Sequence, residues 1–257
     1  MSGRGSWNSN GVGGTLSLKG DKPGLYYRLP ATGTNYIGKA INPADANARA
    51  VKGAVKAYQA GLNRRLNVNL LLDGILGPVT SRVIVDFQKA KALGADGVIG
   101  PVTSKALFMP DLTKSITDLQ KQYPGNNVIT PTIVCGLVTQ ESDWDAGSVG
   151  FVDETDLGLV QINGRSHPEY SEEQRLNPLV AFPFVFSYLR TSLVNDKIVT
   201  VDDAIASYNL GVGGAINWIK AGRPALWDPT GKKPGDPNYN PRDVRGYINK
   251  IKTVCAG

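Results

Sequence analysis

The apolar positions of residues 131–141 recur at intervals of three and four, the spacing of one face of an α-helix. That face consists of Val134, Leu137, Val138 and Glu141. Thr130-Pro131 comes just before it, and a hydroxyl residue followed by proline is a favourable helix start. The pattern therefore predicts a helix that places one carboxylate, Glu141, at the end of its apolar face.

Two short apolar stretches follow this helix. Residues 148–152 and 157–162 alternate or run apolar, and the turn-prone residues 153–156 lie between them. Such runs on either side of a turn predict a β-hairpin. Asp156 would start the returning strand, and acidic side chains would lie about one hairpin away from Glu141.

A carboxylate that faces apolar residues loses solvent, which favours its protonated form. A protonated glutamate can act as a general acid and donate its proton to a leaving oxygen. The alternative is that Glu141 simply reaches water at the end of the helix. The pattern alone leaves both interpretations open.

An earlier region combines a helix with an internal repeat. The helix would follow Asn42-Pro43. Its apolar stripe consists of Ala48, Val51, Ala54, Val55, Tyr58 and Leu62. The sequences DGILGPVTSRVIVDFQ, from Asp73, and DGVIGPVTSKALF, from Asp96, then repeat with a period of 23 residues. Each copy has an Asp-Gly turn and a Gly-Pro pair that opens a helix. The region thus predicts a three-helix module.

Four motifs occur in order along the last half of the chain. They are ESDW (141–144), DLGLVQIN (156–163), ASYNLGVGG (206–214) and RGYINKI (245–251). Together they resemble the lysozyme superfamily, and in particular the soluble lytic transglycosylases and related phage lysozymes. The resemblance implies an α+β lysozyme-like domain over residues 111–257 that cleaves the β-1,4 bond between N-acetylmuramic acid and N-acetylglucosamine in peptidoglycan.

The same resemblance implies roles for individual residues. Glu141 would be the catalytic acid. The residues that bind the sugar or position the acid would be Gln161, Tyr208, Asn209 and Tyr247. Spacing alone also allows a structural role for two of them. Tyr208 shares an apolar helix face with Ala204 and Ile205, and Asn209 could belong to a helix C-terminus before Gly211.

Asp156 leaves two mechanisms open. The segment TDLGLVQIN (155–163) resembles animal-type lysozymes, in which the aspartate is the second catalytic carboxylate. Glu141 would then act with Asp156, and water would complete a hydrolysis. If Asp156 only opens a turn, Glu141 would act alone as acid and then base, as in a lytic transglycosylase, and the product would carry an anhydro ring.

The repeat resembles the peptidoglycan-binding domain found beside cell-wall hydrolases. The resemblance covers residues 42–110 and implies a shallow groove around the Asp-Gly turns. It points to Asp73, Gly74, Asp96 and Gly97 as binding residues. Turn chemistry is the simpler interpretation for the two glycines, since glycine supplies backbone angles that other residues avoid. The whole chain is therefore expected to be mainly α.

Composition and charge narrow the choice of partners. A chain of 257 residues is long enough for about two domains, and its net charge of +6 favours polyanions such as bacterial walls. The charge is dispersed and no nucleic-acid fold signature occurs, so we expect no nucleic-acid partner. Cys135 and Cys255 lack companion ligands, which predicts no metal site. No cofactor is expected either. Whether they pair stays open, and the only histidine, His167, is expected in a loop.

The chain shows no secretory signal and no apolar run long enough to span a membrane. A wall-cutting enzyme of this kind is expected on a phage virion or tail, or in the host cytoplasm with release to the periplasm or wall, as for an endolysin. The Gly-rich residues 1–41 would dock to a phage tail or tail-like particle. The alternative function is a non-catalytic wall-binding component of such a particle.

Overall fold

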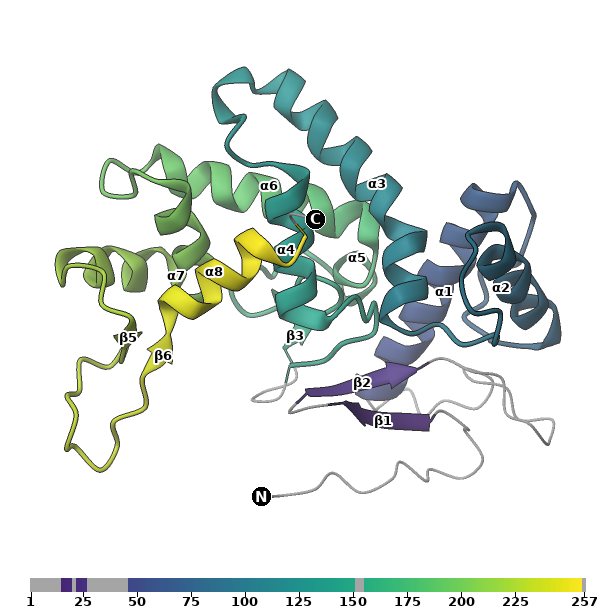
Figure 1. Cartoon of the computed structure of the whole chain (residues 1–257), viewed down its shortest axis with the longest axis horizontal. Helices are drawn as coiled ribbons and strands as arrows, with labels where there is room; N and C mark the ends of the chain where they lie inside the picture. Colours follow the sequence, from purple (N-terminus) through teal and green to yellow (C-terminus); the bar gives the residue numbers. More distant parts are fainter. Residues whose placement is uncertain (1–14, 20–21, 27–45, 151–154, 256–257) are drawn as a thin grey trace. The chain divides into compact units, whose positions relative to one another are not determined.

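The computed structural model describes residues 15–19, 22–26, 46–150 and 155–255. Within these ranges the chain is mainly helical, with eight α-helices and three two-stranded antiparallel sheets (Figure 1). This confirms the predicted fold class. The chain divides into two compact units, which alternate along the sequence: residues 1–111 with 141–181, and residues 112–140 with 182–257.

The first unit contains the predicted helical module. Helix α1 spans Ala46–Leu66, α2 spans Pro78–Ala90, and α3 begins at Pro101 and runs to Gln122. Prolines open α2 and α3 at positions 23 residues apart, as the repeat predicts. Five residues of the predicted stripe of α1 are buried, namely Ala48, Ala54, Val55, Tyr58 and Leu62, and the sixth, Val51, is half-buried. The predicted start at Asn42-Pro43 lies outside the described residues.

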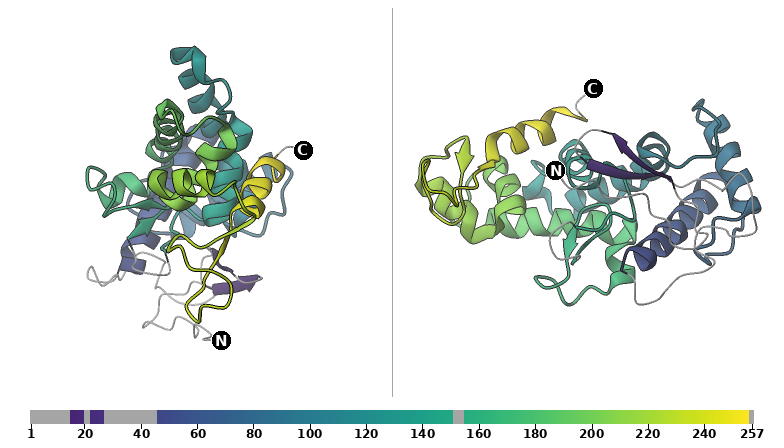
Figure 2. Two further views of the ribbon diagram at one scale, coloured as in Figure 1. Left: turned by 90° about the vertical axis from the view of Figure 1, so that its left-hand side faces the viewer. Right: turned by 90° about the horizontal axis from the view of Figure 1, so that it is seen from below.

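Part of the predicted N-terminal segment forms a strand pair. Strands β1 (Thr15–Lys19) and β2 (Lys22–Tyr26) are antiparallel, with Thr15 opposite Tyr26 and Lys19 opposite Lys22. Both arrows are visible in Figures 1 and 2. The other residues of the segment 1–41 lie outside the described part of the chain.

The hairpin after helix α4 (Pro131–Ser142) is shorter than predicted and pairs differently. Strand β3 (Asp156–Leu157) pairs with β4 (Ile162–Asn163), so that residues 158–161 form the turn. Of the predicted strand 148–152, Val149 forms one isolated bridge, to Leu157, and residues 151–154 are not described. The apolar run 157–162 therefore folds back on itself, because Gly158 and Gln161 both adopt a positive φ.

Four further helices and a strand pair complete the described chain. Helix α5 is Glu172–Arg175, α6 is Pro178–Val194, α7 is Val201–Lys220 and α8 is Val244–Thr253. Strands β5 (Leu226–Trp227) and β6 (Arg242–Asp243) pair at the base of a long loop that leads to α8. A short 3-10 helix, Pro124–Asn126, precedes α4.

Helix α4 spans Pro131–Ser142, and its predicted start is confirmed by a bond from the Ile133 amide to Thr130 Oγ1, at 3.3 Å. In the second unit, α4 packs closely against α8. A Cβ atom added to Gly136 would overlap the Ile251 carbonyl oxygen. A disulfide joins Cys135 to Cys255 beside this contact. The pairing that the sequence left open is therefore formed.

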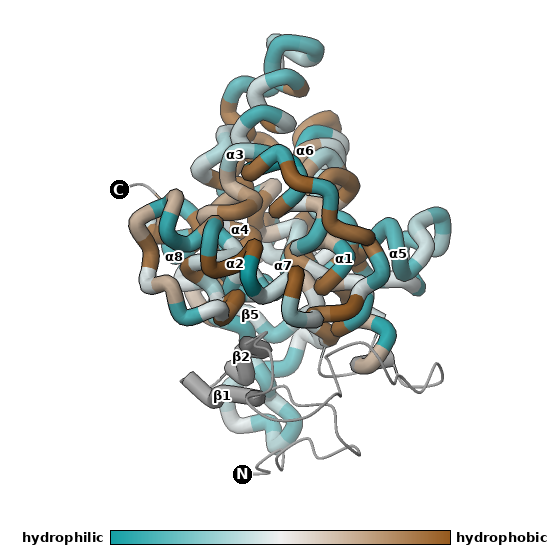
Figure 3. Tube along the Cα trace, turned by 90° about the vertical axis from the view of Figure 1, so that its right-hand side faces the viewer, coloured by the Kyte–Doolittle hydropathy of each residue, from teal (hydrophilic) through white to brown (hydrophobic). Residues whose placement is uncertain are grey.

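The core of the second unit draws on several helices, α4 and α6 among them. Its fully buried members include Val134, Leu137, Val138, Phe182, Val185, Phe186 and Leu189. Hydrophobic and hydrophilic residues alternate along the helices (Figure 3), as one buried and one solvated face require. Among the described residues, none of the helices is both long and apolar enough to cross a membrane.

Candidate active site

Glu141 is the penultimate residue of α4 and is half-buried. The apolar residues one and two turns before it on the same face are fully buried. The next residue, Ser142, is also buried, and its hydroxyl donates to the Leu159 carbonyl at 2.8 Å. Thus α4 ends with a carboxylate whose neighbour is bonded to the turn of the hairpin.

Asp156 lies on β3 and is half-buried. Its Oδ1 accepts a 2.7 Å hydrogen bond from Nδ2 of Asn163, the residue opposite it in the sheet. A Cβ atom added to Gly150 would lie 2.9 Å from the Asp156 Cβ, so the backbone of Gly150 passes close to this side chain. Both contacts hold Asp156 locally within the hairpin.

Gln161 stabilises the turn of the same hairpin through two hydrogen bonds. Its Nε2 donates to the Ser148 carbonyl at 3.1 Å and to the Gly158 carbonyl at 2.9 Å. Its backbone has a φ of 53°, in the left-handed region that non-glycine residues rarely adopt. The structure thus gives Gln161 a scaffolding role, and sugar binding by this residue stays a prediction.

Arg175 is a residue that the sequence pattern did not reveal. It is buried at the end of α5, and its Nη1 donates to the Thr155 carbonyl at 2.5 Å. Its own carbonyl lies so close to Gly158 that no Cβ fits there. A single arginine in a polar segment carries no periodic signal, so only the fold identifies it as the support beneath the hairpin.

The other three predicted site residues belong to the second unit. Tyr208 is half-buried on α7 and meets the Tyr188 ring edge-on, with the centroids 5.1 Å apart. Tyr188 donates its hydroxyl to the Ser207 carbonyl at 2.8 Å, and burial raises the pKa of that hydroxyl. Tyr247 lies buried on α8. Aromatic packing therefore fixes Tyr208, in line with the structural interpretation of its spacing.

Asn209 lies just before a break in α7. Gly211 has φ 71° and ψ 159°, which interrupts the helix as the Asn-Leu-Gly pattern suggested. Arg242 of β6 donates through Nη1 to the Asn209 carbonyl, and the same nitrogen lies 3.3 Å from Asn209 Oδ1. A cation at the C-terminal end of a helical segment is favourable. Arg242 is a second residue that the sequence pattern did not reveal.

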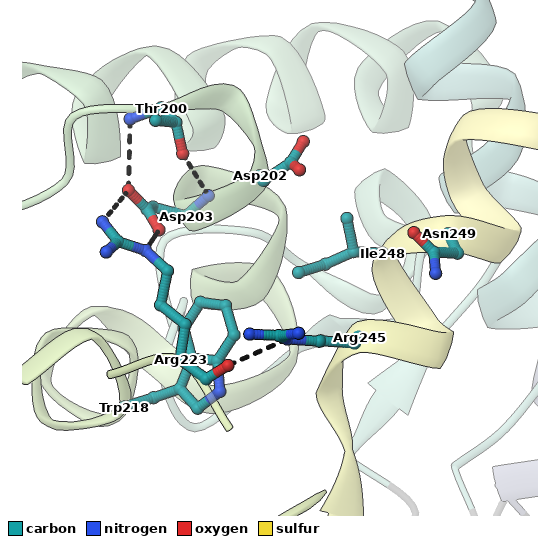
Figure 4. A pocket seen from close by; sticks show the side chains of 8 residues that line it. All are labelled: Thr200, Asp202, Asp203, Trp218, Arg223, Arg245, Ile248 and Asn249. Carbon is teal, nitrogen blue, oxygen red and sulfur yellow. Dashed lines mark hydrogen bonds and ion pairs between the residues drawn. The ribbon is translucent and has the colours of Figure 1, made fainter. Parts of the chain in front are cut away.

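A polar pocket of about 460 Å³ occurs in the second unit (Figure 4). Its lining residues are Thr200, Asp202, Asp203, Trp218, Arg223, Arg245, Ile248 and Asn249. Arg223 donates to both oxygens of the buried Asp203 at 2.8 and 3.0 Å, and Arg245 Nε donates to the Arg223 carbonyl. Burial opposes the charge on Asp203, but the bonds from Arg223 and Thr200 outweigh it and hold its pKa below the ordinary range. These paired charges stabilise the fold around α7.

Two matching glutamine clamps hold the Asp-Gly turns of the helical module. Gln59 Nε2 donates to Asp73 Oδ1 at 2.8 Å, and its Oε1 accepts from the Gly74 amide at 3.0 Å. Gln88 makes the same two bonds to Asp96 and Gly97, both at 2.9 Å. Gly74 and Gly97 have φ near +73° and +72°. The four predicted binding residues thus shape the turns, and their contact with the wall stays a prediction.

Among the described residues, acidic, histidine and cysteine side chains form no group of three or more that could hold a metal ion. His167 lies in the loop after the hairpin, with Nδ1 3.3 Å from Glu169 Oε1.

Comparisons with protein families agree with this architecture. Residues 51–107 match the family described as a putative peptidoglycan binding domain. Residues 118–225 match the transglycosylase SLT domain. No curated protein matches the chain. The first match covers the clamped turns, and the second covers Glu141, Asp156 and the break in α7. The chain thus matches a putative peptidoglycan binding domain followed by a transglycosylase SLT domain, which supports peptidoglycan degradation of the lytic transglycosylase type.

Proposed function

We propose that this protein is a lytic transglycosylase in which Glu141 is the only catalytic carboxylate. Glu141 would protonate the glycosidic oxygen between N-acetylmuramic acid and N-acetylglucosamine. It would then accept the proton of the muramic acid 6-hydroxyl, which attacks the sugar's C1 and closes the anhydro ring. The observation that carries this proposal is the SLT match over residues 118–225, with Glu141 half-buried at the end of α4.

The surroundings of Asp156 support the single-acid route. Asn163 and the backbone of Gly150 both hold its side chain within the hairpin. The bond from Asn163 occupies one of the two carboxylate oxygens of Asp156. The second candidate is hydrolysis, in which Asp156 stabilises or captures the glycosyl cation. It is favoured by the position of Asp156 on β3, the first strand after Glu141.

The products distinguish the two routes. We expect purified peptidoglycan digested by the wild-type enzyme to release muropeptides with anhydro ends, each lighter by one water than the hydrolysed form in mass spectrometry. The conservative variant Asp156→Asn should retain most activity. Reducing ends in place of anhydro ends, together with loss of activity in Asp156→Asn, would establish the hydrolase.

The variant Glu141→Gln tests the acid itself. A positioned general acid accelerates a reaction by roughly 10²–10⁴-fold, so we expect clearing in a peptidoglycan zymogram to fall by at least about that factor. Glu173→Gln is the matched control, because Glu173 is exposed on α5. Equal clearing by Glu141→Gln would remove this residue from the mechanism, and no clearing by the wild type would favour a non-catalytic wall-binding component.

We also propose that residues 1–41 attach the enzyme to a phage tail or tail-like particle, from which it reaches the wall. A two-stranded ribbon such as β1 and β2 is by itself only marginally stable in water, which supports a partner for it. A variant without residues 1–41 should digest purified peptidoglycan normally. It should fail to co-sediment with phage tails or tail-like particles. Equal co-sedimentation of both forms would contradict the docking role.

A further inference from the structure

The backbone directly after Glu141 is held in an unusual conformation. Asp143 and Trp144 are consecutive non-glycine residues with φ of 50° and 66°. Such residues are strained, and they persist only where their surroundings impose the conformation. The contacts that impose it therefore also determine where α4 ends and where Glu141 lies.

Two of these contacts come from the peptidoglycan-binding domain. Ser104 on α3 donates its hydroxyl to the Trp144 carbonyl at 2.6 Å. The Ala146 amide donates to the hydroxyl oxygen of Tyr58 on α1 at 3.2 Å. Both bonds are buried, and the Trp144 ring is only 1% exposed. They span 40 and 88 residues of sequence within the same compact unit.

Tyr58 is itself rigidly placed. It is 1% exposed and stacks on Phe108 of α3, with ring centroids 5.6 Å apart and planes 21° apart. Burial, followed by the nearby charge of Asp145, raises the pKa of its hydroxyl, so the group stays neutral. A buried neutral hydroxyl on a stacked ring is a fixed hydrogen-bond partner for the residues after Glu141.

Other contacts in the same compact unit also join the peptidoglycan-binding domain to residues 141–181; together with the bonds of Tyr58 and Ser104 they form a junction. Arg49 of α1 makes two bonds to Glu172 of α5, at 2.7 and 2.8 Å. Leu176 packs against Gly53 so closely that a Cβ there would lie 2.5 Å from its Cδ1. Ala50, Leu157 and Leu176 form a shared apolar cluster. The binding domain therefore forms one packed body with residues 141–181.

We propose that Tyr58 and Ser104 are positioning residues for Glu141, so that the peptidoglycan-binding domain is part of the catalytic scaffold as well as a wall anchor. This inference depends on the proposed role of Glu141. It implies that substitutions of these two residues lower kcat even on a soluble glycan, for which anchoring to the wall is irrelevant.

The test compares Ser104→Ala and Tyr58→Phe with the wild type in the full chain. Tyr58→Phe keeps the ring on Phe108 and removes only the hydroxyl, so folding is preserved. Ser115→Ala is the matched control, since Ser115 is a half-buried serine further along the same helix. The measurements are kcat and KM on a soluble peptide-free glycan strand, co-sedimentation with insoluble wall, and the melting temperature.

We expect kcat to fall by about 10- to 100-fold in both variants, because small displacements of a catalytic group have effects of that size. KM and co-sedimentation should stay within about twofold, and Ser104→Thr, which keeps the hydroxyl, should recover kcat. Unchanged kcat, or a fall matched by an equal fall in the folded fraction, would overturn the inference. If Glu141→Gln is inactive while Tyr58→Phe is normal, only this inference fails; if Glu141→Gln is active, the proposed function fails.

Discussion

Cys135 in the middle of α4 is covalently joined to Cys255, two residues beyond the end of α8 and 120 positions later in the chain. The bond ties the C-terminal helix to the helix that carries Glu141.

Removing this disulfide should destabilise the protein. Closing a loop of this length stabilises a fold by roughly 4–5 kcal/mol in the chain-entropy model, and measured losses are about 2–5 kcal/mol. We expect Cys135→Ser/Cys255→Ser to lower the free energy of unfolding in urea by that amount. Dithiothreitol should destabilise the wild type and leave the double variant unchanged. Equal urea midpoints for both proteins would contradict the prediction.

Gly136→Ala should be strongly destabilising, because the added methyl group would overlap the backbone of Ile251 and push α8 from α4. Overpacking of this kind costs about 1–3 kcal/mol or more. Gly213→Ala on α7 is the matched control, since an added Cβ meets nothing within 4 Å there. That control should be neutral or more stable by up to about 1 kcal/mol. Thermal unfolding of both variants checks the difference.

The Asp203–Arg223 pair should make stability depend on acid pH. The pKa of Asp203 is lower in the folded protein than in the unfolded chain. Its contribution to the free energy of unfolding is therefore fully present above the ordinary aspartate pKa of about 3.9, and it is lost as the pH falls through the lower folded pKa. We expect Asp203→Asn to lower the free energy of unfolding by roughly 1–3 kcal/mol at pH 7 and by much less at pH 2–3. Urea titrations at both pH values measure this, with exposed Asp196→Asn as the control. A cost that does not change with pH would exclude the charge as its cause.

Arg242→Ala should reduce activity through Asn209, whose carbonyl and side chain it holds at the break in α7. The loss of one such bond is worth about 0.5–1.5 kcal/mol, so kcat/KM should fall by up to about tenfold. Arg242→Lys should retain part of the activity, and Lys233→Ala, an exposed change in the same loop, should retain all of it. Full activity in Arg242→Ala would argue against a role for Asn209.

Gln88→Leu should destabilise the second Asp-Gly turn, because it removes the two hydrogen bonds between Gln88 and that turn. The buried Gly97 amide would lose its acceptor, which costs about 1–3 kcal/mol, and Asp96 would lose a donor. We expect lower stability and weaker co-sedimentation with peptidoglycan, and the same from Gln59→Leu at the first turn. The control is Gln122→Leu at the exposed end of α3. Undiminished co-sedimentation in a folded Gln88→Leu variant would separate the turns from wall binding.

Local patterns determined much of this protein. The apolar stripe around Tyr58, the 23-residue repeat and the Thr130-Pro131 start all yield helices where they are predicted. Periodicity and capping act over a few residues, so they can be seen without a fold. Spacing also anticipated the helix break at Gly211 and left the role of Tyr208 open between core and cleft.

Only the tertiary structure decided the contacts between distant segments. It shortened the hairpin around Asp156, placed Arg175 beneath it and joined Cys135 to Cys255. It also brought Tyr58 and Ser104 against the residues that follow Glu141. The physical reason is that the bonds of Arg175, Ser104 and Tyr58 and the disulfide join residues between 20 and 120 positions apart. A single hydroxyl or guanidinium leaves no periodic trace in the sequence.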